Sequence, residues 1–112
     1  MTVPESIRIL IQRLDLELDE SEQAANRGLE LLQSVISVFS KNAIMIRYYA
    51  YFNNVLFFVN LSRNKIETIK ESLLSENLTT QLIQETGEDL SLMLGQLLET
   101  KIELNRILQI LD

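Results

Sequence analysis

Apolar residues recur along this chain of 112 residues at alternating steps of three and four. Such spacing puts them on one side of a helix and is typical of a helix that packs along its length against others. The pattern forms three uninterrupted runs, which predict an all-α fold of three long helices over about residues 3–39, 43–74 and 79–111. The core-facing positions of the first run are Ile7, Ile11, Leu14, Leu18, Ser21, Ala25, Gly28, Leu32, Val35 and Phe39.

The two later runs keep the same spacing. The segments between the runs, residues 40–42 and 75–77, are short and polar, and Asn42 is suited to cap the second helix. Three long helices joined by short turns must alternate in direction, so we expect an antiparallel, coiled-coil-like bundle that forms one domain over residues 1–112. The core-facing positions are Met45, Tyr48, Phe52, Val55, Val59, Ser62, Ile66, Ile69 and Leu73, then Ile83, Gly87, Leu90, Leu94, Leu97, Lys101, Leu104, Leu108 and Leu111.

The ends of the helices are less firmly specified. Residues 2–5 fit a capping box with Pro4 in the first turn. Because a residue before proline avoids the helical conformation, Val3 is an alternative N-cap. Within the third run, Thr86-Gly87 allows the helix to stop and restart with Thr86 as its new cap. The whole sequence contains only 3 Gly and 1 Pro, and such sparse helix-breaking residues favour a few long helices.

Two glycines test the proposed order of the helices. Gly28 lies inside the first run, where glycine costs about 1 kcal/mol relative to alanine, so we expect a large side chain to pack closely against it. Folding the chain at its two turns places Gly28 opposite Val55, and Gly95 opposite Val59. Large side chains facing small ones fill a core at native density, which supports the up-down-up order.

Residues 43–61 of the second helix carry six of the seven aromatic residues and are apolar beyond the core-facing positions. A helix that is apolar all round must be covered all round, and two neighbouring helices do not suffice. We therefore expect a non-enzymatic interaction, scaffold or regulatory protein that self-associates, most simply as a homodimer, or that pairs with another helical protein as one subunit of a hetero-complex. The interface candidates are Arg47, Tyr48, Tyr49, Tyr51, Phe57 and Phe58.

The cluster around Arg47 also has a chemical interpretation. Arginine among tyrosines can bind a phosphate or carboxylate, or stack on the rings, so an anion or small-ligand site is the alternative function. Packing explains the same residue types, because tyrosine and arginine are enriched where a partner buries a surface. Asn53 and Asn54 need hydrogen-bond partners, which a second copy would supply.

Composition excludes several classes of function. The chain has no His and no Cys, which removes the commonest general base, metal ligand and thiol nucleophile, so we expect no catalytic residues and no cofactor. The net charge of −6 disfavours nucleic acid. Arg47, Asn53, Asn54 and Asn60 make membrane insertion of residues 43–61 costly, and no signal-peptide layout follows Glu5, so we expect a cytoplasmic protein.

Acidic residues raise the question of a metal site. Asp15, Asp19 and Glu22 share one face of the first helix at steps that would suit Mg²⁺ or Ca²⁺. The run lacks the glycine turn of a calcium loop, so we interpret it as a solvated outer face without metal, and give Glu85, Glu88, Asp89, Glu99 and Glu103 the same interpretation. Lys101 stands among leucines, where a lone polar residue sets register or extends outward along its apolar stem. Along the second helix, we expect the ion pairs Arg63–Glu67 and Glu67–Lys70.

Overall fold

Three helices account for most of the part of the chain that the computed structural model describes, residues 2–38, 41–75 and 77–112. They are α1 (Glu5–Val38), α2 (Ala43–Leu73) and α3 (Thr80–Leu111). The predicted all-α fold is therefore confirmed, with helix ends within about two residues of those expected, the usual spread of such boundaries. The expected positions of Phe39, Ser40 and Glu76 lie outside the described residues.

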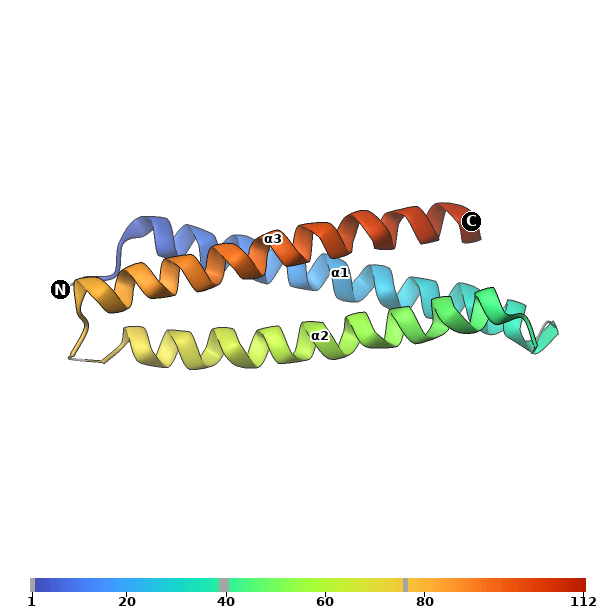
Figure 1. Ribbon diagram of the computed structural model, residues 1–112, viewed down its shortest axis with the longest axis horizontal. Helices are drawn as coiled ribbons and strands as arrows, with labels where there is room; N and C mark the ends of the chain where they lie inside the picture. The colour runs from blue at the N-terminus through green and yellow to red at the C-terminus, as the bar shows by residue number, and fades with distance from the viewer. Residues whose placement is uncertain (1, 39–40, 76) are drawn as a thin grey trace.

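The helices run side by side in alternating directions along a slender bundle of 58 × 19 × 17 Å (Figure 1). Helix α1 is the shared element, because both α2 and α3 pack along it while they contact each other only sparsely. In Figure 1 the ribbons of α2 and α3 diverge from one another toward the C-terminus of α3. The bundle is thus a three-helix array with α1 between two flanking helices. None of the helices in the described ranges has an apolar run long enough to cross a lipid bilayer.

Side-chain caps fix the starts of the last two helices. The Asn42 side chain accepts hydrogen bonds from the backbone N–H groups of Ile44 and Met45, at 3.0 and 3.2 Å, as predicted for this residue. Thr79 caps α3 by accepting from the Leu82 N–H at 3.1 Å. Helix α3 is continuous through residues 86–87, so the alternative of a break there is wrong.

The start of α1 differs slightly from the expected capping box. The Pro4 carbonyl, one residue before the helix, accepts from the N–H groups of Ile7 and Arg8. Proline therefore precedes the first helical residue and does not lie inside the first turn, because its fixed φ suits this boundary while its missing N–H costs nothing there.

The core is built along α1. The buried residues of this helix are the first eight core-facing positions read from the sequence, from Ile7 to Leu32, while Val35 is half-buried. Leu14, Leu18 and Leu32 are fully enclosed between α2 and α3. The third helix departs more from the expectation, because Thr86, Met93 and Ile107 join its buried side. A helix that faces a single neighbour can rotate slightly about its axis, and α3 does so relative to the predicted run.

Gly28 is the point of closest approach between α1 and α2. A Cβ atom built on Gly28 would lie 2.3 Å from the ring atom Cζ of Phe52, and Phe52 is fully buried. The prediction of a large side chain against Gly28 is confirmed, but the contact is Phe52, one helical turn from Val55. Gly95 does not face α2 as expected, because it is exposed and a Cβ there meets nothing within 4 Å.

The two glycines make a matched pair for mutagenesis. We expect Gly28→Ala to destabilise the protein by about 1–2 kcal/mol, since overpacking costs roughly 1–3 kcal/mol and alanine recovers part of that through its helix propensity. Gly95→Ala should instead raise the free energy of unfolding by about 0.5–1 kcal/mol. Urea unfolding of both variants measures the difference, and equal stabilities would show that Phe52 does not pack on Gly28.

Ser21 provides a second test of the core. It is fully buried, and its Oγ makes no hydrogen bond in the described part of the chain. We expect Ser21→Ala to stabilise the protein by about 1 kcal/mol, because a buried unsatisfied hydroxyl carries its full desolvation cost. Ser91→Ala, at an exposed position within α3, controls for helix propensity. If thermal unfolding shows the same shift for both variants, the Ser21 hydroxyl has a partner.

Candidate functional site

The acidic run of α1 lies between basic side chains from both flanking helices. On the side toward α2, Arg63 donates to Asp19 at 2.7 Å and also forms an ion pair with Glu22. About two helical turns after Arg63 on α2, the Lys70 ammonium lies 3.7 Å from the Asp15 carboxylate. The face that Asp15, Asp19 and Glu22 share is therefore the face that α2 neutralises. The Glu22 and Asp19 carboxylates raise the pKa of Arg63 above its ordinary value.

The other side of the acidic run faces α3. Lys101 Nζ lies 3.0 Å from the Glu17 carboxylate and also pairs with Glu20. Glu17 has only 13% of its side chain exposed, so this is the least solvated ion pair of the described residues. The hydrogen bonds that Lys101 donates to Glu20 and then to Glu17 raise the pKa of Lys101. Lys101 thus leaves the leucine-lined side of α3 to reach α1, as its long stem allows.

These contacts correct the interpretation of the acidic run. It is not a freely solvated face, because its carboxylates pair with basic side chains of the flanking helices. Among the described residues, no group of three or more metal-ligating side chains was found. The expected Arg63–Glu67 pair is replaced by the contacts of Arg63 with α1, whereas the Glu67–Lys70 pair forms at 3.3 Å. The arrangement serves to align α2 and α3 on α1.

A double-mutant cycle measures this alignment. We expect the coupling between Lys101→Met and Glu17→Gln to be about 1 kcal/mol, the upper end for partly exposed ion pairs, and to shrink in 1 M salt. The cycle of Lys65→Met with Glu17→Gln is the control, since Lys65 lines a different surface. Coupling no larger than in the control, from urea unfolding of all variants, would contradict the contact.

The six predicted interface residues do not form one patch. Tyr48 points toward the core and is half-buried, and Tyr51 and Phe58 line the boundary with α3. Tyr49 lies on the opposite side of α2, against Asn26 and Leu29 of α1. Phe57 has 65% of its surface exposed and points outward, while Arg47 is exposed on the same helix. The aromatic segment therefore presents several different surfaces.

The tyrosines nearest Arg47 are directed at α3. The Tyr51 hydroxyl donates to the Thr100 carbonyl at 3.4 Å, and burial, followed by the charge of Glu103, raises the pKa of Tyr51. Arg106 binds Glu103 at 3.0 Å, and this contact, with a smaller contribution from Tyr48, raises the pKa of Arg106. The Tyr51 hydroxyl is thus used in a contact with α3.

Asn53 also differs from the expectation. The Asn53 amide donates to the Tyr49 carbonyl of its own helix at 3.0 Å, so it needs no second copy as a partner. Asn54 lines a hollow of about 170 Å³ that it shares with Tyr51, Phe58 and Thr100. This hollow belongs to a larger feature that sequence reasoning missed.

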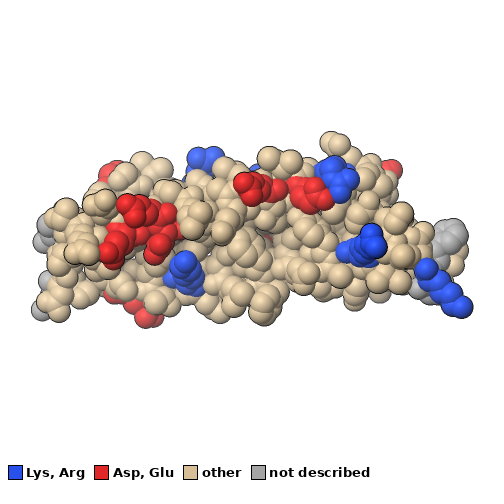
Figure 2. Space-filling view, viewed as in Figure 1, with Lys and Arg blue, Asp and Glu red and all other residues tan. Residues whose placement is uncertain are grey.

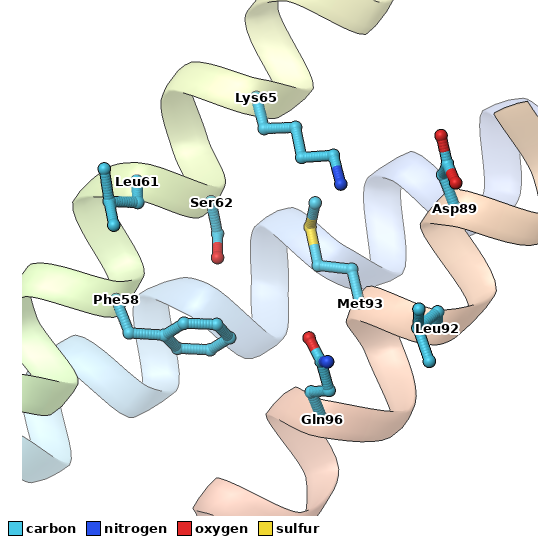
Figure 3. A pocket seen from close by; sticks show the side chains of 8 residues that line it. All are labelled: Phe58, Leu61, Ser62, Lys65, Asp89, Leu92, Met93 and Gln96. Carbon is cyan, nitrogen blue, oxygen red and sulfur yellow. The ribbon is translucent and has the colours of Figure 1, made fainter.

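That feature is a groove between α2 and α3, which we call the α2–α3 groove. Farther along it, a second hollow of about 250 Å³ is lined by Phe58, Leu61, Ser62, Lys65, Asp89, Leu92, Met93 and Gln96. Figure 3 shows Phe58 and Lys65 of α2 and Met93 of α3 extending toward the space between the two helices, with Leu61 and Leu92 at its outer borders. Phe58 lines both hollows, so they lie next to each other. The groove exists because α2 and α3 pack on α1 and scarcely on each other.

A sequence signal for the groove was present in α3. Leu92 and Met93 are apolar residues that flank the core-facing positions Leu90 and Leu94, and Leu92 is 65% exposed. Together with Leu61 of α2, which is 52% exposed, they give the groove an apolar middle.

No known protein family matches this chain, and no curated protein or solved structure is similar to it.

Proposed function

We propose that this chain is a non-enzymatic helical interaction protein that self-associates through residues 43–61 of α2. The observation that carries the proposal is the exposure of large apolar side chains on this segment. Isolated apolar residues on a surface are ordinary, but several close together on one helix mark a site of association. The exposed residues are Ile44, Ile46, Phe57 and Leu61, each with about half or more of its surface accessible.

The chemistry of the polar residues supports the same proposal. The basic residues Arg63, Lys70 and Lys101 are used in ion pairs that join helices. The tyrosines near Arg47 bond to α3 or lie on other sides of α2, which leaves the anion-binding alternative without a cluster to support it. What remains available for recognition is the apolar surface of α2 and its border with α3. A homodimer is the simplest assembly, and a second helical protein is the alternative occupant.

Mutation of the outward residues tests self-association without disturbing the core. We expect light scattering to give a mass of at least twice 12.9 kDa for the native chain, and the single-chain mass for Phe57→Glu/Leu61→Glu. Buried charges at an interface are costly, whereas in the separated chain both positions face solvent. Circular dichroism should show unchanged helix content.

The matched control is Leu16→Glu with Ile9→Glu, because these α1 residues are exposed to about the same extent as Leu61. This variant should keep the native mass. A native chain that stays monomeric at millimolar concentration would refute self-association and leave a second helical protein as the partner to seek. A dimer unaffected by Phe57→Glu/Leu61→Glu would place the interface elsewhere.

A further inference from the structure

Within the described residues, ion pairs join α2 and α3 to α1, but none joins α2 to α3. The basic side chains of α2 and α3 in these pairs are Arg63, Lys70 and Lys101. Along the α2–α3 groove, by contrast, Lys65 and Asp89 line the same hollow, yet neither takes part in an ion pair within the described ranges. In Figure 3 the two side chains stand on opposite helices at the rim of the hollow.

The unpaired charges are separated by sign between the two helices. Residues 31–66 contain no Asp or Glu, and residues 72–100 contain no Lys or Arg. Arg47 lies four residues before the groove-lining Tyr51, so it lies on the same face of α2 as Tyr51 and Lys65. By the same spacing, Glu85 and Glu99 continue the side of α3 that contains Asp89 and Gln96. We call Arg47 and Lys65 the basic edge of the groove, and Glu85, Asp89 and Glu99 its acidic edge.

The groove-facing residues of each helix are spaced as in a helix that packs along its length against other helices. Along α3, the groove-facing positions advance in steps of four and three, and along α2 they recede in the same steps. Alternating steps of this kind keep a continuous contact surface along a helix, with charges flanking an apolar middle. The positions are Arg47, Tyr51, Asn54, Phe58, Leu61 and Lys65 on α2, and Glu85, Asp89, Leu92, Gln96, Glu99 and Glu103 on α3.

The space-filling view agrees with this division. Figure 2 shows a broad uncharged strip between the two helices, with most acidic side chains along the α3 side and isolated basic side chains along the α2 side. From Arg47 to Lys65 the strip is about 27 Å long at about 1.5 Å per residue, and it is about two helices, or roughly 20 Å, wide. Such a footprint is of the same order as the roughly 800 Å² per partner that a stable interface buries.

We infer that the α2–α3 groove is the docking surface for a second copy of this chain, related by a two-fold axis that runs along the bundle. This inference rests on the proposed self-association and specifies its geometry. A two-fold axis along the bundle lays the basic edge of each copy over the acidic edge of the other. The apolar middle, with Phe58, Leu61 and Leu92, then meets its own equivalent, as in any isologous contact.

The charges select this axis over the other symmetric choice. A two-fold axis across the bundle would place α2 on α2, whose groove edge is basic, and α3 on α3, whose groove edge is acidic. Like charges brought together in this way cost several kcal/mol at an interface. With the axis along the bundle, Lys65 of each copy faces Asp89 of the other, because the two residues line the same hollow at one level of the bundle.

Charge reversal of each edge tests the arrangement. Arg47→Glu/Lys65→Glu makes both edges acidic, and Glu85→Lys/Asp89→Lys makes both edges basic. We expect each variant alone to have its dissociation constant raised at least about tenfold, measured by sedimentation at several concentrations. An equimolar mixture of the two should recover native affinity as a heterodimer, and so should the chain that carries all four substitutions. Arg8→Glu/Arg13→Glu, which reverses two exposed charges on α1, is the control and should leave association unchanged.

Disulfide trapping separates the two axes, because the chain has no cysteine of its own. Leu61 and Leu92 line the same hollow, so the inferred axis brings Leu61 of one copy to Leu92 of the other. A mixture of Leu61→Cys and Leu92→Cys chains should cross-link at least about tenfold faster than Leu61→Cys with Gly95→Cys, whose thiol would sit on the far side of α3. Faster linking of Leu61→Cys chains to each other would overturn the inferred axis.

The outcomes distinguish this inference from the proposed function. A native dimer that tolerates both edge reversals keeps self-association and refutes the groove as its site. A native monomer in which Phe57→Glu/Leu61→Glu changes nothing refutes both. Loss of the dimer in each reversed variant, with recovery in the mixture and in the four-substitution chain, supports the groove with the axis along the bundle.

Discussion

The whole bundle depends on α1, which has to bury one side of its length against two helices that scarcely touch each other. Leu14, Leu18 and Leu32 are fully enclosed because α2 and α3 approach from either side. At Gly28 the missing side chain lets the Phe52 ring enter, and this close contact fixes the level of α2 along α1. Close-packed interiors tolerate little displacement, so one such contact constrains the helix on both sides of it.

Electrostatics reinforces the position that packing chooses. The carboxylates of α1 point to both sides of its buried face, and each side meets a cation from a different helix, Arg63 from α2 and Lys101 from α3. Partly exposed ion pairs contribute little energy individually. Here they contribute to the alignment of the helices. The apolar pattern repeats every turn, so by itself it hardly opposes a shift of one helix by one turn, whereas such a shift would separate the paired charges.

The same arrangement leaves the molecule incomplete on its α2–α3 side. Since both flanking helices use their best apolar positions on α1, exposed residues between them, such as Leu61 and Leu92, line an open groove. The charges at its edges carry opposite signs on the two helices and find no ion-pair partner in the described part of the chain. A surface that is apolar in the middle and complementary to itself at its edges is suited to assembly.

Much of the fold was determined by the sequence, because helix periodicity fixes which side of each helix is buried. The sequence pattern predicted the three helices, the buried residues of α1 from Ile7 to Leu32 and the Asn42 cap. It also predicted that a large side chain packs against Gly28. Only the tertiary structure decided that Phe52 and not Val55 meets Gly28, that Gly95 faces solvent, and that the acidic run binds Arg63 and Lys101. It also divided the six predicted interface residues among different surfaces and opened the groove. Periodicity describes each helix about its own axis and repeats every turn, whereas levels and distances between helices depend on packing among residues far apart in the chain.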